Sequence, residues 1–156
     1  MSYAYGLLTM YDMTAKIGTE YAAGTGGAAG TWTYANLGDG IENLTEALNE
    51  TIQQYFFLGD GGYGKNHVTA MAPAYTFTGK RVFGDAAQDY IFSKKFALNG
   101  DRRSSFQLVW GDGTNTYTLT CDCTICNVQE LSGASTEDCS ISFEIRLDGE
   151  PTLATT

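Results

Sequence analysis

The stretch GKRVFGDAAQDYIFS, residues 79–93, is the clearest interruption in a chain of strand-like segments. The segment AYTFTGK that leads into it alternates aromatic and threonine residues, which is typical of a half-buried β-strand. At Asp85 the alternation stops, and Gln88 follows three residues later in a spacing that resembles a capping box. We therefore predict one short α-helix over residues 85–93, placed between strands.

The predicted helix carries an apolar stripe made of Ala86, Ala87, Tyr90 and Ile91. Residues three and four positions apart lie on one face of a helix, so this stripe is expected to pack on the strands. Asp85 is expected to accept hydrogen bonds from the backbone N–H groups of the first turn. Cap and stripe together predict a short helix with a fixed position.

The rest of the chain is dominated by strand patterns. SFQLVW and TYTLTCDC flank the turn GDGTN and predict a hairpin, and CSISFEIRL places four apolar residues on one face. Further strands are predicted around residues 8–17 and at 31–37, and DGEP at 148–151 is expected to close the domain. We predict a mainly β fold over a single domain, residues 1–156: an antiparallel β-sandwich or partly closed barrel with the helix at its flank.

Two segments stand apart from this pattern. Residues 22–30 are rich in glycine and alanine and predict a flexible loop. Residues 40–66 are ambiguous, because Leu44 and Leu48 have helical spacing whereas TIQQYFFL favours a strand that ends in a glycine-rich turn. We interpret 40–66 as an extended arm with a strand from about residue 50 to 58.

Composition excludes several classes of function. The chain has 18 acidic and 9 basic residues, a net charge of −9, so the basic patch that a phosphate-gripping protein needs is missing. The first ten residues lack the basic segment of a signal peptide, and no apolar run approaches the roughly 18 residues of a membrane span. We expect a cytoplasmic protein without membrane contact, whose four cysteines stay reduced.

Three motifs resemble binding sites. GDGGYGKN at 59–66 is close to a phosphate-binding loop, but Asn66 replaces the hydroxyl residue and Asp60 would repel phosphate, so a hairpin turn is favoured. GTGGAA at 24–29 lacks a βαβ setting and is interpreted as a loop. The spacing of Cys121, Cys123, Cys126 and Cys139 does not match common zinc sites, so small apolar core residues are favoured over a metal or a disulfide. We expect no cofactor and no metal.

Catalytic residues are not indicated either. His67 is the single histidine and lies beside the glycine-rich turn, where a solvated side chain is the ordinary interpretation. The carboxylates form no pair that spacing singles out, and an acidic surface accounts for most of them. We therefore expect that the protein is not an enzyme.

Two stretches carry a resemblance to a known family. TFTGKRVFGDAAQDYIF and the later SFEIRLDGEPT, residues 142–152, resemble in order and spacing the tail tube (major tail) proteins of long-tailed bacteriophages of Gram-positive hosts. The similarity covers roughly residues 40–152, is weak over the first 35 residues, and has no counterpart for CDCTIC. It implies a protein of the virion tail, assembled in the host cytoplasm from hexameric rings that stack into a hollow tube.

The resemblance also implies partners and surfaces. The partners are other copies of the chain, the tape measure, tail terminator and baseplate proteins, and double-stranded DNA that passes without specific binding. The expected contacts between subunits or rings are Glu42, Leu44, Leu48, Glu50, Ile52, Tyr55, Lys94 and Lys95. The expected lumen-facing residues are Thr116, Thr118, Thr120, Asp122, Ser142 and Glu144. Tyr90 and Ile91 are expected in the core of their own subunit, with a contact to a neighbour as the alternative.

Two other functions stay open at this point. One is the tube of a contractile tail or of a phage-derived bacteriocin, which uses the same mechanics inside a sheath. The other is a carbohydrate-binding β-sandwich, in which tyrosine and tryptophan side chains would stack on sugars. The sequence does not give the host, the tube length, the helical symmetry or the role of the cysteines.

Overall fold

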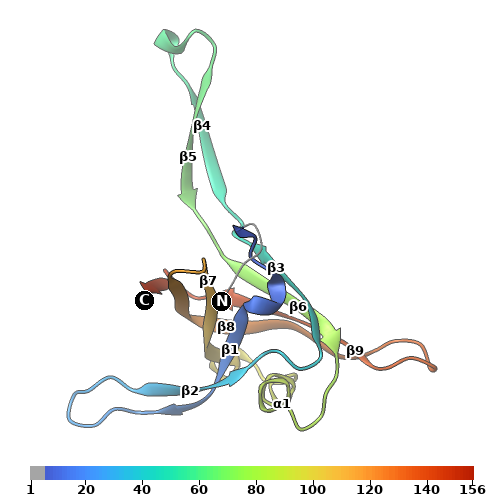
Figure 1. Ribbon diagram of the computed structural model, residues 1–156. Coiled ribbons are helices and arrows are strands. Elements are labelled where there is room, and N and C mark those ends of the chain that lie inside the picture. The colour runs from blue at the N-terminus through green and yellow to red at the C-terminus, as the bar shows by residue number, and fades with distance from the viewer. Residues whose placement is uncertain (1–5) are drawn as a thin grey trace.

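The alternating segments of the sequence build one antiparallel sheet with a single α-helix against it (Figure 1). This computed structural model describes residues 6–156. Its strands and helix are β1 (Thr14–Ala22), β2 (Thr31–Asn36), β3 (Ile41–Ala47), β4 (Thr51–Phe56), β5 (Gly64–Ala70), β6 (Ala74–Lys80), α1 (Ala86–Ser93), β7 (Arg103–Gly111), β8 (Thr116–Ser132), β9 (Ser140–Leu147) and β10 (Thr152–Thr155). The mainly β, antiparallel prediction is confirmed.

The main sheet has the strand order β2-β1-β7-β8-β9-β6-β3. Its centre is β8, which runs for 17 residues and pairs with β7 along one edge. Along its other edge β8 pairs first with β10, through residues 117–120, and then with β9, through residues 123–132. The strands β4 and β5 form a separate two-stranded sheet.

The sheet curls so that its apolar face closes on itself. In a flat sheet β6 and β7 would lie three strand spacings apart, about 14 Å. The rings of Tyr75 on β6 and Phe106 on β7 nevertheless have centroids only 5.1 Å apart. Phe77 and Phe143 stack beside them at 5.1 Å, and Phe92 of α1 meets Phe143 edge-on at 6.1 Å. The helix therefore closes the open side of the curled sheet, as predicted.

The helix begins where the sequence predicts. Asp85 is the N-cap, and its Oδ2 accepts the backbone N–H of Gln88 at 3.0 Å. Ala87 and Ile91 are fully buried, and Tyr90 is half-buried against the core. The predicted stripe is wrong at one position, because Ala86 is exposed. The buried face is rotated by one residue and consists of Ala87, Gln88, Ile91 and Phe92.

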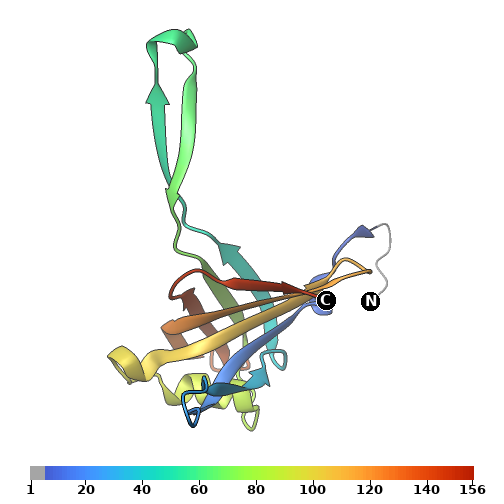
Figure 2. The same cartoon turned by 90° about the vertical axis from the view of Figure 1, so that its left-hand side faces the viewer.

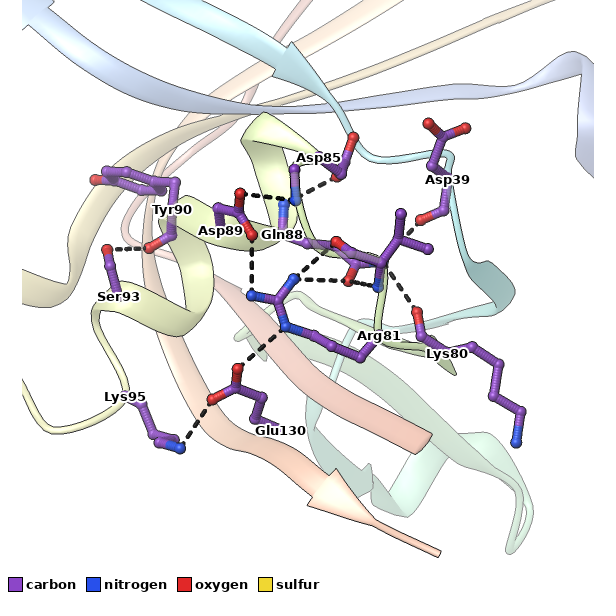
Figure 3. Close-up of polar contacts among 12 residues, drawn as sticks. Asp39, Lys80, Arg81, Asp85, Gln88, Asp89, Tyr90, Ser93, Lys95 and Glu130 are labelled. Atoms are coloured by element: carbon purple, nitrogen blue, oxygen red, sulfur yellow. Dashed lines mark hydrogen bonds and ion pairs between the residues drawn. The ribbon is translucent and has the colours of Figure 1, made fainter. Parts of the chain in front are cut away.

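The side chain of Gln88 corrects the predicted capping box. It is completely buried and points into the body instead of reaching back to the cap. Its Nε2 donates to the carbonyl oxygens of Asp39, at 2.7 Å, and Lys80, at 3.1 Å, and its Oε1 accepts the N–H of Val82 at 2.9 Å (Figure 3). One amide thus ties the helix to β6 and to the turn before β3.

Arg81 takes part in the same set of contacts between α1 and the sheet. Its guanidinium donates to Asp89 of α1 at 2.9 Å and to Glu130 of β8 at 3.1 Å, and its side chain is only 5% exposed (Figure 3). Lys95 donates to the other oxygen of Glu130 at 2.8 Å. The hydrogen bond from Lys95, and after it the one from Arg81, hold the pKa of Glu130 below its ordinary value.

Gly79, the first residue of the stretch 79–93, lies where a side chain would not fit. A Cβ at this position would collide with the carbonyl oxygen of Gly40 on the neighbouring turn. The close approach lets the N–H of Lys80 donate to that same oxygen at 2.7 Å. Glycine is needed here because the turn crosses directly over the strand end.

Three predicted boundaries change. The first strand covers 14–22 instead of 8–17, because a 3₁₀ turn occupies Met10–Asp12. DGEP does not end the fold, since the chain continues into β10. The loop between β1 and β2 covers 23–30, as predicted, whereas the strand at 31–37 stops at Asn36. Within the described residues, no helix is long and apolar enough to cross a membrane.

Candidate assembly surfaces

The arm, residues 48–72, projects from the sheet as a hairpin of β4 and β5 (Figures 1 and 2). The two strands pair in the register Ile52 to Val68 and Tyr55 to Lys65, with an irregularity after Thr51. Every residue of both strands is exposed. An isolated two-stranded hairpin is marginal in water, so this arm needs a partner surface to be stable.

The arm concentrates the exposed apolar side chains of the molecule. Of the nineteen large apolar residues exposed in the described chain, nine lie in the arm: Leu48, Ile52, Tyr55, Phe56, Phe57, Leu58, Tyr63, Val68 and Met71. Leu58 at the tip has the full exposure of an isolated side chain, and Phe56 is 64% exposed. Exposed apolar surface gathered on one element makes the arm a candidate site for contact with another molecule.

The arm begins later than the sequence predicts. Residues 41–47 pair with β6 in the main sheet, so the predicted arm of 40–66 becomes a free hairpin at 48–72. Leu44 is half-buried against the core and Glu42 lies at the irregularity of β3, so both belong to the body. Leu48, Glu50, Ile52 and Tyr55 are exposed in the arm or at its base.

The base of the arm has a defined turn. Asn49 adopts the left-handed conformation with φ of 51°, and its Nδ2 donates to the carbonyl of Ala72 at 2.9 Å. The N–H of Ala72 donates to the carbonyl of Leu48 at 2.9 Å. These contacts close the hairpin where it leaves the sheet.

The tip of the arm is the glycine-rich segment that resembles a phosphate loop. It forms a 3₁₀ turn at Leu58–Asp60 followed by Gly61 in the left-handed region, so the hairpin turn is confirmed. Asp60 pairs with Lys65 at 3.4 Å. His67 lies on β5 and meets the ring of Tyr55 edge-on at 5.8 Å, so it is a strand residue instead of a loop residue.

A second surface is the sheet face that points away from α1. Along β8 the odd-numbered residues 121–125 are buried, so the even-numbered residues face the other way. The register places Thr118, Thr120 and Asp122 beside Val109, Gln107 and Ser105 of β7. The predicted lumen-facing residues of β8 and β9 therefore share one polar face: Thr116, Thr118, Thr120, Asp122, Ser142 and Glu144.

Glu144 on this face is paired with a cation. Glu144 accepts the guanidinium of Arg146 at 2.6 Å and the amide of Asn127 at 2.8 Å. The hydrogen bond from Arg146 holds the pKa of Glu144 below its ordinary value, so the carboxylate stays ionised. Asn127 lies in the left-handed region, with φ of 50°, at the irregularity where β8 leaves its regular register with β9.

The cysteines divide as the strand pattern predicts. Cys121 and Cys123 are buried on the apolar face of β8, whereas Cys126 is half-buried on the other face. Burial raises the pKa of the Cys123 and Cys121 thiols, which disfavours the thiolate that binds metals. Within residues 6–156 no three His, Cys, Asp or Glu side chains cluster in a geometry for a metal ion.

The last predicted contact residues lie at the end of α1. Lys94 is the C-cap residue and its Nζ lies 5.4 Å from the centroid of the Tyr90 ring. Lys95 is held by Glu130 and lies 5.1 Å from the ring centroid of Phe96. Phe96 itself is 89% exposed, and sequence reasoning missed it because an isolated aromatic residue after a helix carries no pattern.

Comparison with solved structures identifies the fold. The chain superposes with a TM-score of 0.69 on a chain of the virion of a native gene transfer agent particle, at 12% identity over 95% of this chain and 99% of that one. It superposes with a TM-score of 0.65 on a chain from the tail of an empty gene transfer agent particle, solved by helical refinement with C6 symmetry, at 14% identity and the same coverage. Neither a family model nor a curated protein matches the sequence.

Proposed function

We propose that the protein is a structural subunit of a phage-type tail, which self-assembles into stacked rings that form a hollow tail tube. The observation that carries this proposal is the arm: a hairpin exposed on both faces, with nine large apolar side chains in contact with solvent. In a monomeric protein such a hairpin would be marginally stable and would promote aggregation, whereas in an assembly its apolar side chains can be buried against a neighbouring subunit. The fold shared with gene transfer agent chains supports the same assignment.

In this proposal the arm joins one ring to the next. Within residues 6–156 neither outer edge of the β4–β5 hairpin pairs with another strand, and an open strand edge is a template for another chain. Leu48, Glu50, Ile52 and Tyr55 are the arm residues that the sequence singled out. Lys94 and Lys95 contribute from the helix end, and Glu42 and Leu44 contribute from the edge strand β3 of the body.

The polar sheet face lines the lumen in this proposal. It carries hydroxyl groups and the ion pair of Glu144 with Arg146, and the net charge of −9 disfavours the holding of phosphates. DNA would pass along Thr116, Thr118, Thr120, Asp122, Ser142 and Glu144 without binding. The C6 symmetry of the gene transfer agent tail supports six copies per ring. Tape measure, tail terminator and baseplate proteins are the proposed further partners. The proposed host is a Gram-positive bacterium, and assembly is proposed to take place in its cytoplasm.

Imaging the concentrated, purified chain by negative-stain electron microscopy tests the proposal. We expect rings with six-fold symmetry that stack into tubes. A chain that stays monomeric at high concentration, and that forms no rings in isolated particles, would contradict it. A sheath around the tube in those particles would favour a contractile tail or a bacteriocin over a non-contractile tail.

One observation favours a second candidate, a carbohydrate-binding module. A cavity of about 500 Å³ between the β1–β2 hairpin and the start of β7 is lined by Tyr21 and Trp32, whose ring centroids lie 5.2 Å apart. Aromatic faces with nearby polar groups, here Arg103 and Asp148, are suited to sugars. Oligosaccharide binding by a chain that remains monomeric, measured by calorimetry, would replace the first proposal with this one.

A further inference from the structure

The end of the body farthest from the arm carries a second exposed apolar surface. Both views place α1 opposite the arm (Figures 1 and 2). The helix-end patch consists of Phe83, Lys94, Lys95, Phe96 and Leu98, which flank or follow α1. Phe83 and Leu98 are each 75% exposed and Phe96 is 89% exposed.

Contacts within the body link the two aromatic rings of this patch. The guanidinium carbon of Arg81 lies 4.1 Å from the ring centroid of Phe83, and the Nζ of Lys95 lies 5.1 Å from that of Phe96. Both cations bind Glu130, at 3.1 and 2.8 Å, so the two aromatic rings are fixed on either side of one ion-pair network. The patch is therefore rigid as well as apolar, which lowers the entropy lost on binding.

We propose that the helix-end patch is the surface that receives the arm of a second copy of this chain. This inference rests on the proposed function and names the counterpart of the arm. The arm offers the matching chemistry: apolar side chains at Phe56, Phe57 and Leu58, and the carboxylates of Glu50 and Asp60 against a single lysine. Lys94 is the cation of the patch that complements Glu50, because within one subunit Lys95 pairs with Glu130 and Asp60 pairs with Lys65.

The positions of the two surfaces fit repeated assembly. A contact between different surfaces at opposite ends of one molecule leaves a free arm and a free patch after each addition, so it continues without limit. A contact of one arm with another arm would close as a dimer instead. With seven residues in β5, the paired part of the arm reaches about 23 Å, enough to lie along the patch of the next copy.

Charge substitutions at the patch test this assignment. Phe96→Glu and Leu98→Glu are to be compared with Leu131→Glu, a 70% exposed residue of β8 outside the patch. We expect the two patch variants to form rings but to lose at least about tenfold in stacking by sedimentation velocity, and the control to stay within about twofold of the parent. Melting temperatures like that of the parent exclude a folding defect. Patch variants that stack as well as Leu131→Glu would overturn the inference.

Cysteine cross-linking tests the contact directly. Leu58→Cys combined with Phe96→Cys should give, on mild oxidation of assembled tubes, a ladder of covalent multimers that the parent and Leu58→Cys with Leu131→Cys do not give. Cross-linking by Leu58→Cys alone would show arms paired with arms and would overturn the inference. If the parent forms no rings or tubes, the proposed function is wrong. If the parent stacks through the arm, but the patch variants stack normally and the cysteine pair gives no cross-links, this inference alone is wrong.

Discussion

The body and the arm are both antiparallel β-structure, but they bury their apolar residues in opposite ways. In the body, Phe77, Phe106 and Phe143 are at most 1% exposed, and their rings contact one another across a curled sheet. In the arm, Phe56 and Phe57 are more than half exposed on a hairpin that no other element covers. Phenylalanine side chains therefore stabilise the subunit in the body, whereas in the arm they stay exposed and are free to contact another molecule.

Removing the arm should have the largest effect. Replacing residues 48–73 by Asn-Gly joins Ala47 to Ala74, which already pair, through a two-residue turn. We expect a folded, soluble body with a melting temperature close to that of the parent. Stacking should be lost, as seen by electron microscopy. Tubes formed by the shortened chain would show that the arm is only a surface loop.

Two phenylalanine truncations sharpen the contrast between the regions. Phe143→Ala should lower the free energy of unfolding by about 3–5 kcal/mol, because it leaves a cavity among buried rings. Phe56→Ala should change it by less than about 0.5 kcal/mol and reduce assembly. Urea unfolding of both variants, with sedimentation of the assembled material, measures the two quantities. Equal destabilisation by the two changes would mean that the arm is packed in the free subunit.

Gln88→Leu tests the polar joint beneath the helix. The change removes the side-chain partner of the carbonyls of Asp39 and Lys80 and of the N–H of Val82, all in part-buried positions. We expect a loss of about 2–3 kcal/mol in the free energy of unfolding, since each unsatisfied group costs about 1–3 kcal/mol and the site can relax in part. The matched control is Gln54→Leu on the exposed arm, which should be nearly neutral in urea unfolding.

Asp85→Ala tests the cap itself. Losing the hydrogen bond to the N–H of Gln88 should lower the free energy of unfolding by about 1 kcal/mol, whereas Asp85→Asn should keep most of it. Thermal melting of both variants separates capping from charge. Two variants that melt like the parent would show that the helix start is fixed by Gln88 and Arg81 alone.

The smallest expected effect is a dependence on pH. Lys95 and Arg81 hold the pKa of Glu130 in the folded protein below its unfolded value. This carboxylate therefore stabilises the fold above its unfolded pKa, about 4.5, and the contribution is lost as the pH falls through the lowered folded value. Glu130→Gln should be less stable than the parent at neutral pH, with a gap that narrows below pH 4 or so. Asp60→Asn, which removes one carboxylate of the exposed arm, is the control for charge alone.

The body was largely predictable and the arm was not, for a physical reason. A strand packed on one side alternates apolar and polar residues, so β6, β9 and α1 could be placed within a residue or two. The strands of the arm have no packed side, so Ile52, Tyr55, Phe56 and Phe57 follow no period and the boundary was set too early.

Tertiary contacts were the other source of error. The local sequence does not distinguish Arg81 from an exposed cation or Gln88 from a capping residue. The partner of Arg81 is Glu130 and the partner of Gln88 is Asp39, and each lies 49 residues away in the sequence. Glu42 and Leu44 were predicted to lie in the arm, whereas they lie in β3, which pairs with β6 in the main sheet; their role as contact residues stays a prediction. Local propensity could not show either outcome.

The way the arm joins the sheet has a mechanical consequence. The arm is a continuation of β3 and β6, which pair with each other from Leu44 opposite Phe77 to Ala47 opposite Ala74. Antiparallel hydrogen bonds run perpendicular to their strands, so tension along the arm loads the whole β6–β9 ladder in shear instead of opening it one bond at a time. A joint anchored in this way resists pulling along its axis far better than peeling from the side.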